Sequence, residues 1–398
     1  MTSFSLVDKY TQKTEFLPRS VVKNSLIVGN SLLLSQGVNL NKAKDFVPIV
    51  TGKATNKSSG DYKRLTRYFD QGKVETEKDR GSYNELMEYL RTLSWVVLFN
   101  QKKGGRRKFN LKKVNYLLLD GTKWDFGEHH LHLLTLCIVI DDVAIPIWWE
   151  DLEKAGHSSQ EERMEYIKSA MKSYKLQGMT LLADREYIGY KWFAWLHKQK
   201  IRFVIRVKEG IYHDEINEAK GLMWEKMKEK AQAKTKGKKV SKRFKLAGVE
   251  LFYIILKNPR PEADDELIHL ISDWKSPTQA AYIYQLRWQI EVCFKHLKSN
   301  GLNLEKMSVQ GKEKRHLMMA IAVLVYILAI REGIIEESSL KNKVLFKKDV
   351  HTGFYYRAES IFRKGLSILI RKFLKVNCFL KYLKSIISKD FHYLFKNV

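Results

Sequence analysis

The stretch from Tyr282 to Asn300 constrains the fold most, because it places two different stripes of side chains on one predicted helix. At about 100° per residue, four polar residues spread over fifteen positions fall within an arc about 60° wide, and apolar residues fill the neighbouring arc. A solvated helix face mixes its charges at i,i+4 spacing, whereas here one acid lies between two bases beside a buried seam. We therefore expect a helix that packs into a core and presents side chains suited to a metal ion and a polyanion. The polar stripe is Tyr284, Arg287, Glu291 and Lys298; the apolar stripe is Ile283, Leu286, Ile290, Phe294 and Leu297.

The overall charge indicates a polyanionic partner. The 398 residues include 71 Lys and Arg against 44 Asp and Glu, which gives a formal net charge of +27. A basic balance of this size favours nucleic acid over a membrane surface, with a merely soluble basic protein as the alternative. The length predicts two or three domains.

The cysteines and the apolar segments indicate a cytosolic protein. Cys137, Cys293 and Cys378 lie far apart and form no CxxC pair, which argues against a zinc site and for a reducing compartment. The N-terminus has no apolar signal core. The longest apolar run, residues 317–330, is shorter than the roughly 20 residues that span a bilayer, so we expect a buried helix and no membrane partner.

Two apolar runs that end in a carboxylate predict buried strands. Residues 115–120 (NYLLLD) end in Asp120, and residues 179–184 (MTLLAD) end in Asp184. A lone Asp at a strand end is more often a turn residue. Adjacent strand ends would nevertheless bring the two carboxylates within reach of one another. Further strands are expected at 128–140, 143–149 and 201–207, and helices at 158–174 and 190–200, in the order β-β-β-α-β-α-β.

The four polar residues of the first stripe carry a family resemblance. Tyr284, two residues, Arg287, three residues, Glu291, six residues, Lys298 resembles the Y-R-E-K signature of the IS4-type DDE transposases, the group of the Tn5 and Tn10 enzymes. The DGT at 120–122 and the Asp-Arg-Glu at 184–186 are similar to that family's first two catalytic motifs. The resemblance covers residues 115–300. It implies that Asp120, Asp184 and Glu291 are the catalytic residues and the metal ligands.

The resemblance also implies an α/β fold with a defined layout. An RNase H-like catalytic core carries a β-rich insertion and is flanked by an N-terminal helical DNA-binding domain and C-terminal helices. The expected units are a DNA-binding domain at 1–72, a linker and helix at 73–114, a core at 115–208 plus 276–335, the insertion at 209–275, and a C-terminal dimerisation region at 336–398. Without the resemblance, the last segment would be a basic amphipathic tail, with a membrane surface as a less favoured partner.

A basic helix near the N-terminus is the expected DNA reader. Helices are predicted at 20–34, 41–50 and 61–70, and the last exposes Lys63, Arg64 and Arg67 after a turn, as a major-groove helix requires. The alternative is an ordinary three-helix bundle with a basic surface. Residues 71–81 are predicted to be a linker and 82–100 a helix. The basic loop 101–108 suits a phosphate backbone and a solvated turn equally.

Two features of the insertion stay open. Strands are expected at 249–256 and 267–272, and the basic run 220–245 is either a DNA contact or a flexible loop. The family's base-stacking tryptophan has no match at its usual place, Leu267. Trp224 and Trp274 are the nearest candidates, so base stacking is not assigned.

The residue types define the chemistry. Three carboxylates without His or Cys select Mg²⁺ or Mn²⁺ over Zn²⁺, and two ions about 4 Å apart would serve an in-line displacement. Arg287 and Lys298 suit phosphate, and Tyr284 can donate to a phosphate oxygen. Arg185 is expected to contact DNA as well.

The resemblance implies cut-and-paste DNA transposition in the cytoplasm of a bacterium, at the nucleoid. A homodimer would bind double-stranded terminal inverted repeats, free a 3′-OH, form and reopen a hairpin, and join the 3′-OH to target DNA. Two alternatives remain: an RNase H-like nuclease that cuts without joining, and a non-catalytic DNA-binding protein derived from a transposase.

Overall fold

The structure is a computed structural model. It describes residues 17–52, 58–99, 114–126, 129–154, 156–218, 224–234, 239–258, 265–274, 276–339, 346–348, 350, 355–357, 359–375, 379–387 and 389–395. The predicted basic loop at 101–108 and Cys378 lie outside these residues. Cys137 and Cys293 are free and buried.

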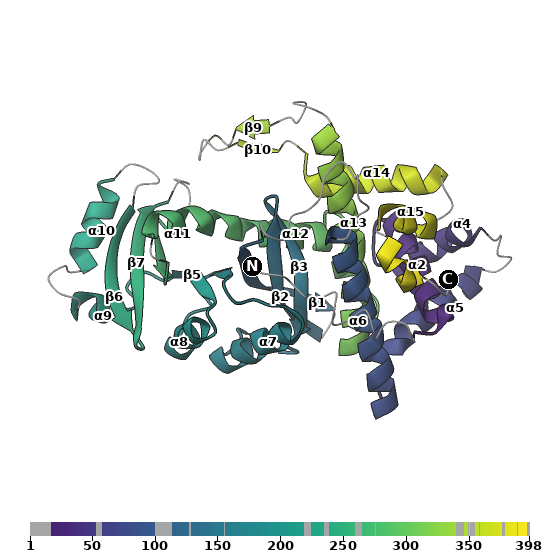
Figure 1. Ribbon diagram of the computed structural model, residues 1–398, viewed down its shortest axis with the longest axis horizontal. Helices are drawn as coiled ribbons and strands as arrows, with labels where there is room; N and C mark the ends of the chain where they lie inside the picture. The colour runs from purple at the N-terminus through teal and green to yellow at the C-terminus, as the bar shows by residue number, and fades with distance from the viewer. Residues whose placement is uncertain are drawn as a thin grey trace.

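The molecule is a mixed α/β protein built on one eight-stranded, mostly antiparallel sheet (Figure 1). The strand order is β3-β2-β1-β4-β5-β8-β7-β6, in which β4 runs parallel to both β1 and β5 and the other neighbours are antiparallel. Helices α7 and α8 lie along one side of the sheet, and α11 and α12 along the other. The bounds are β1 Tyr116–Phe126, β2 His129–Ile140, β3 Val143–Asp151, α7 Gln160–Ser173, β4 Thr180–Ala183, α8 Tyr190–Lys198 and β5 Arg202–Val207.

The first five strands form where the apolar runs predicted them. β4 is buried at every position, and the Leu117–Leu119 segment of β1 is fully buried, as expected for strands covered on both faces. Asp141 and Asp142 join β2 to β3, both with positive φ (47° and 61°), the backbone that a tight two-residue hairpin requires. Helix α7 begins with a capping box, in which the Ser159 hydroxyl accepts from the Glu162 amide and the Glu162 carboxylate accepts from the Ser159 amide.

The prediction that the first strand ends at Asp120 is wrong. β1 continues to Phe126, because its hairpin with β2 stays paired through Phe126 and His129. Parallel pairing with β4 does stop at Leu119 opposite Ala183, so Asp120 is the first residue of β1 beyond its parallel partner. Asp184 is the first residue after β4.

The insertion is not separate from the central sheet. Its strand β8 (Leu267–Ser272) pairs with β5, and β7 (Val249–Lys257) and β6 (Lys239–Leu246) extend the same sheet. Two short helices, α9 (His213–Glu218) and α10 (Trp224–Gln232), lie against these strands. The end of the predicted basic run is therefore the edge strand β6 rather than a flexible loop, and its charges suit an edge that must resist further pairing.

The predicted helix over Tyr282–Asn300 is divided in two. Helix α11 (Pro277–Tyr284) is followed by a 3-10 turn, η5 (Gln285–Arg287), and then by α12 (Trp288–Lys298). The prediction of one continuous helix is wrong because i→i+3 hydrogen bonds replace the α-helical ladder at η5. Four of the five residues of the apolar stripe are buried as predicted, with Ile283, Ile290, Phe294 and Leu297 all less than 9% exposed, and Leu286 in η5 is only partly buried.

The N-terminal region is helical. Its elements are α2 (Arg19–Ser35), α3 (Leu40–Ala43), η2 (Lys44–Phe46), α4 (Val47–Thr51), α5 (Ser58–Phe69), η3 (Asp70–Gly72) and α6 (Glu77–Phe99). The predicted linker at 71–81 is partly wrong, because α6 begins at Glu77. The Thr76 hydroxyl caps this start by accepting from the Asp79 amide.

A long buried helix joins the two halves of the molecule. Helix α13 (Lys312–Ser339) contacts β3 on one side and α2 and α6 on the other (Figure 1). Within the described chain, this one helix is long and apolar enough to cross a membrane, yet 94% of its most apolar window is buried inside the protein. The predicted run at 317–330 is therefore a core helix that extends further at both ends.

The C-terminal helices cover α13 and α2. Helix α14 (Ile361–Lys375) packs its apolar face on α13, and α15 (Phe379–Ile386) lies next to α2. A short hairpin, β9 (Phe346–Lys348) and β10 (Tyr355–Arg357), precedes them, and the 3-10 segments η6 (Leu304–Lys306) and η7 (Lys389–Phe395) complete the described elements. Five apolar side chains of α14 are buried within this chain: Ile361, Phe362, Leu366, Leu369 and Phe373. Dimerisation, which the family resemblance implied, stays a prediction.

Candidate active site

Three carboxylates from distant parts of the chain meet where the parallel pairing of the central strands β1 and β4 ends. Asp120 and Asp184 each follow the last parallel pair of β1 and β4, so they lie side by side. Helix α12 crosses β1 and β3, and its buried Ile290 and Phe294 hold Glu291 over the same place. The three acids that the sequence predicted are therefore brought together.

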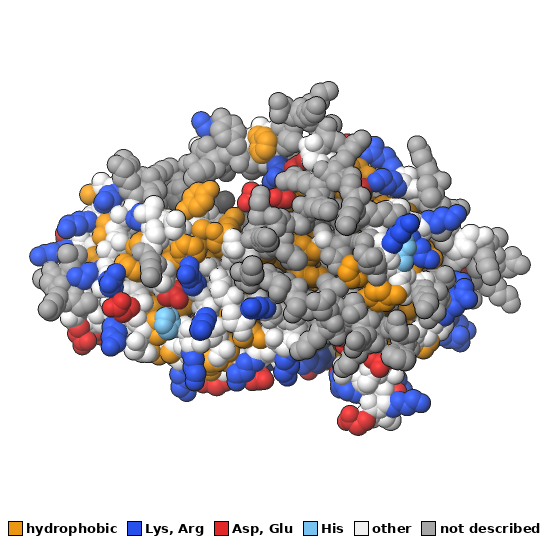
Figure 2. Space-filling view, viewed as in Figure 1, with side chains coloured by type: hydrophobic (Ala, Val, Ile, Leu, Met, Phe, Trp, Pro, Cys, Tyr) orange, Lys and Arg blue, Asp and Glu red, His pale blue; other side chains and the backbone are white. Residues whose placement is uncertain are grey.

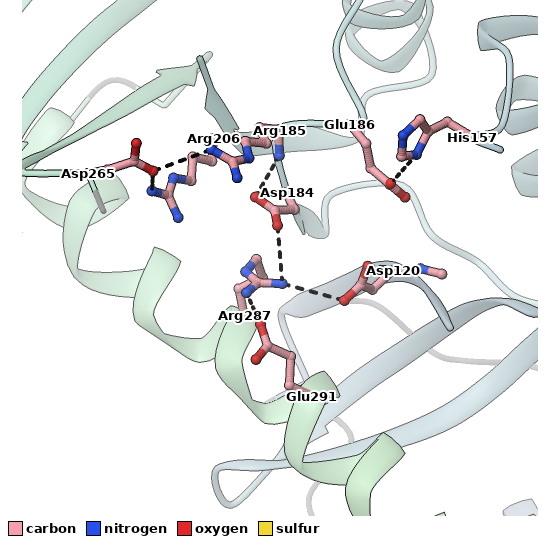
Figure 3. A network of polar contacts seen from close by, with 10 residues as sticks. Asp120, His157, Asp184, Arg185, Glu186, Arg206, Asp265, Arg287 and Glu291 are labelled. Carbon is pink, nitrogen blue, oxygen red and sulfur yellow. Dashed lines mark hydrogen bonds and ion pairs between the residues drawn. The ribbon is translucent and has the colours of Figure 1, made fainter. Parts of the chain in front are cut away.

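The Arg287 guanidinium lies between the three acids (Figure 3). Its Nη1 is 3.5 Å from Oδ2 of Asp120 and 4.0 Å from Oδ2 of Asp184. Its Nη2 donates to Oε1 of Glu291, one helical turn further along the chain. The second oxygen of each aspartate is held by the backbone: Asp120 Oδ1 accepts from the Gly121 amide at 2.8 Å, and Asp184 Oδ1 from the Arg185 amide at 2.7 Å.

Burial dominates the electrostatics of the site. Burial raises the pKa of Asp120 to about 7, and the Arg287 charge opposes that rise. Burial alone would lower the pKa of Arg287, but the Tyr284 hydroxyl and the three carboxylates raise it above its ordinary value. Arg287 is therefore the counter-ion that keeps this cluster of acids in a partly desolvated place.

The donor chemistry of the three acids fits a divalent cation, although their present arrangement does not preform its site. Carboxylate oxygens are the ligands that Mg²⁺ and Mn²⁺ prefer. Among the described residues, no group of three or more His, Cys, Asp or Glu is placed to hold a metal ion. The reason lies in the geometry above, because Arg287 occupies the space between the acids.

The other two residues of the polar stripe reach different positions. The Tyr284 hydroxyl is buried near Arg287 and Asp184 without a hydrogen-bond partner in the described structure, and burial raises its pKa well above the usual value. Lys298 Nζ donates to the backbone oxygen of Lys123 at 2.6 Å. Tyr284 therefore joins the cluster, whereas Lys298 lies beside it on the outer part of β1.

Two arginines on the insertion side share one acid. Asp265 Oδ2 lies 2.6 Å from Nη2 of Arg206 and 3.3 Å from Nη1 of Arg185 (Figure 3). Arg185 was predicted to contact DNA, whereas Arg206 and Asp265 were not predicted to have a role. The available signal was a charge inside the otherwise apolar strand RFVIRV; the ion pair to a residue 59 positions away was not readable.

A polar group on the other side of Asp120 was also missed. His157 Nδ1 lies 2.5 Å from Oε2 of Glu186.

The glycine after Asp120 is closely packed. A Cβ at residue 121 would meet Nε2 of His132 at 2.6 Å and the hydroxyl oxygen of Tyr187 at 3.3 Å. A larger residue than the glycine of the DGT motif, which directly follows Asp120 in the sequence, would therefore force His132 to shift.

The predicted DNA-reading residues lie on α5, away from the acids (Figure 1). Lys63 and Arg67 are exposed, whereas Arg64 is half-buried and its Nε donates to Oδ1 of Asn24 at 3.1 Å. Lys and Arg side chains occur over both the insertion and the N-terminal helices on the face in Figure 2.

Both tryptophans that were left open as base-stacking candidates have structural contacts. Trp224 is 7% exposed and stacks on His269. Trp274 Nε1 donates to Oγ1 of Thr180 at 3.0 Å.

Comparison with known proteins gives one decisive match. The family model described as Transposase DDE domain matches residues 102–328. No curated protein gives a significant match.

Among solved structures, the chain is similar to a piggyBac transposase synaptic complex with hairpin DNA, at a TM-score of 0.44 and 13% identity over 92% of this chain and 74% of that one. It is also similar to Endonuclease V from Bacillus subtilis, at a TM-score of 0.27 and 11% identity over 55% of this chain and 86% of that one. Because the family model covers more than half of the chain, this protein belongs to the Transposase DDE domain family.

Proposed function

We propose that this protein is an IS4-type transposase that moves a DNA element by cut-and-paste transposition. The observation that carries the proposal is the convergence of Asp120, Asp184 and Glu291 on one guanidinium. Membership of the DDE family supports the transposase assignment, and the Y-R-E-K spacing supports the IS4 type.

The catalytic core is an RNase H-like unit of residues 115–208 and 276–335, built from β1–β5, α7, α8, α11, η5, α12, η6 and most of α13. In support of this, β1, β4 and β5 are parallel, β2 is antiparallel to both of its neighbours β1 and β3, and β1 lies between β2 and β4. The segment between β5 and α11 is the family's insertion. The N-terminal helices up to residue 72 form the DNA-binding domain, and the helices after residue 336 are the dimerisation region.

Each site residue has a role that its chemistry supports. Asp120, Asp184 and Glu291 hold Mg²⁺ or Mn²⁺, which when bound would activate an attacking oxygen and stabilise the leaving 3′ oxygen. Arg287 binds a DNA phosphate through its planar guanidinium, and Lys298 and Arg185 add positive charge along the bound DNA strand. Tyr284 donates its unpartnered hydroxyl to a phosphate oxygen. Lys63, Arg64 and Arg67 bind the terminal repeat.

The reaction uses one site for successive transfers. A homodimer brings two transposon ends together, and water frees a 3′-OH at each end. The 3′-OH attacks the opposite strand to form a hairpin, the hairpin is reopened, and the 3′-OH joins target DNA. The protein acts in the bacterial cytoplasm on nucleoid DNA.

The test uses linear DNA carrying the element's own ends, incubated with Mg²⁺ and purified protein and run on a denaturing gel. Glu291→Ala and Asp184→Ala are compared with the wild type. Glu229→Ala, an exposed acid on α10 outside the site, is the matched control.

The proposal predicts hairpin-ended cleavage by the wild type and by Glu229→Ala, with none by the two site variants. Nicks without hairpin or joined product would indicate a nuclease. Binding without any cutting, in Mg²⁺ or Mn²⁺, would indicate a DNA-binding protein.

A further inference from the structure

One guanidinium balances the three acids of the site. In the part of the chain that the structure describes, Arg287 is the basic residue within ion-pair distance of Asp120, Asp184 and Glu291, and no second one joins it there. The Arg287 side chain is 12% exposed, so this pairing is partly desolvated and differs from a loose surface ion pair.

Each aspartate offers one oxygen to the centre of the site. The Oδ1 atoms of Asp120 and Asp184 accept backbone amides, and the Oδ2 atoms both face Arg287. Glu291 likewise directs Oε1 at the same guanidinium. A divalent cation that binds between these acids therefore needs the oxygen atoms that Arg287 now contacts, and it would also repel the guanidinium charge.

The backbone at Arg287 suits a side chain that changes partners. Arg287 ends the 3-10 turn η5, between the regular hydrogen-bond ladders of α11 and α12. A 3-10 stretch within a helical segment often marks a functional hinge. Once free of the acids, the planar fork matches two oxygens of a phosphodiester.

We infer that Arg287 exchanges between the three carboxylates and a DNA phosphate, so that binding of the divalent cation and binding of the DNA end strengthen one another. This inference rests on the proposed function and adds an order of assembly to it. A cation that takes over the carboxylates releases Arg287 for DNA, and a phosphate that attracts Arg287 opens the carboxylates to the cation. By linkage, both effects have the same size, and couplings of this kind are typically about 5- to 150-fold.

The first measurement is Mn²⁺ binding to the full chain without DNA, followed by the electron paramagnetic resonance signal of free Mn²⁺. Arg287→Ala should bind Mn²⁺ at least about fivefold more tightly than the wild type. Arg206→Ala is the matched control, because it removes the same charge from the neighbouring strand but from a pair with Asp265. If Arg287→Ala does not fold by circular dichroism, Arg287→Gln replaces it.

The second measurement is a double-mutant cycle on DNA-end affinity in EDTA. Glu291→Gln should tighten DNA binding when Arg287 is present and leave it unchanged in the Arg287→Ala background.

Unchanged or weaker Mn²⁺ binding by Arg287→Ala, or equal effects of Glu291→Gln in both backgrounds, would overturn the exchange. Neither measurement requires cleavage. A protein that cuts and joins DNA but fails these tests keeps the proposed function and loses the exchange. A protein that passes these tests but does not cut DNA keeps the exchange and loses the proposed function.

Discussion

Replacement of Gly365 by alanine tests how closely α14 must approach α13. A Cβ at residue 365 would lie 1.7 Å from the backbone oxygen of Ala329 and 2.6 Å from the backbone nitrogen of Gly333, whereas real Cβ contacts essentially never fall below 3.0 Å. The two helices must therefore separate locally by at least 1.3 Å, the difference between 3.0 and 1.7 Å. The obstacle is backbone, so rotation of a side chain cannot relieve it.

The cost follows from what the separation disturbs. The face of α14 that meets α13 is almost fully buried, with Phe362 and Leu369 at 0% exposure and Leu366 at 2%. Overpacking of a close-packed core costs about 1–3 kcal/mol and more when the backbone must move. Helix propensity offsets about 1 kcal/mol of this, because alanine favours a helix over glycine. Taking the upper end of the overpacking range, we expect a net loss of about 2 kcal/mol in the free energy of unfolding, a sizeable share of the roughly 5–15 kcal/mol of an ordinary domain.

The assay is urea denaturation followed by far-ultraviolet circular dichroism. Gly81→Ala in α6 is the matched control, because it is also a helical glycine but nothing lies within 4 Å of the added Cβ. The control should gain about 0.5–1 kcal/mol. A Gly365→Ala protein as stable as the wild type would refute the argument from close approach.

Three further perturbations have defined outcomes. Gly121→Ala should push against His132 Nε2, at 2.6 Å from the new Cβ, and lower the rate of DNA-end cleavage about 100-fold, since a shift of about 1 Å beside a catalytic group has that effect; an unchanged rate would contradict it. Burial lowers the pKa of His296 to about 4, below its usual value near 6.5, so its stabilising effect is present above pH 6.5 and is lost as the pH falls toward 4. Between pH 7 and 4.5, the free energy of unfolding of His296→Phe should therefore fall by about 2–3 kcal/mol less than that of the wild type, as measured by denaturation at each pH. The same pH dependence in both proteins would show that His296 does not cause the loss. Glu332→Ala should cost about 3–5 kcal/mol by leaving the buried Arg331 unpaired, and a loss below about 1 kcal/mol would show that water replaces the pair.

The first five strands were predictable because buried strands leave runs of apolar residues in the sequence. The Leu-rich segment of β1 and all of β4 are apolar runs bounded by polar residues, and these read as strands covered on both faces. The apolar stripe of α12 was predictable for a related reason, because burial of one helix face leaves a 3.6-residue period. The acids followed, since each is anchored to one of these elements.

The remaining features depend on pairings between distant segments. That β8 would join β5 could not be read from either strand, because strand partners are set by the tertiary fold. Strand β6 is rich in Lys and Arg and has few apolar residues, and its position at the sheet edge explains that composition. The turn η5 escaped detection because a three-residue change of hydrogen-bond pattern barely alters the helical period.

The arrangement around Arg287 addresses a conflict between folding and catalysis. A site for divalent cations must gather acids, and burial already disfavours the charged form of Asp120 by raising its pKa. A permanent lysine or arginine bridge would remove that cost but would also block the site. In the exchange that we propose, a guanidinium on a 3-10 turn avoids both difficulties, because it pairs with the acids until a cation and a DNA phosphate replace those contacts. The proposed exchange therefore depends on the position of Arg287 one helical turn before Glu291.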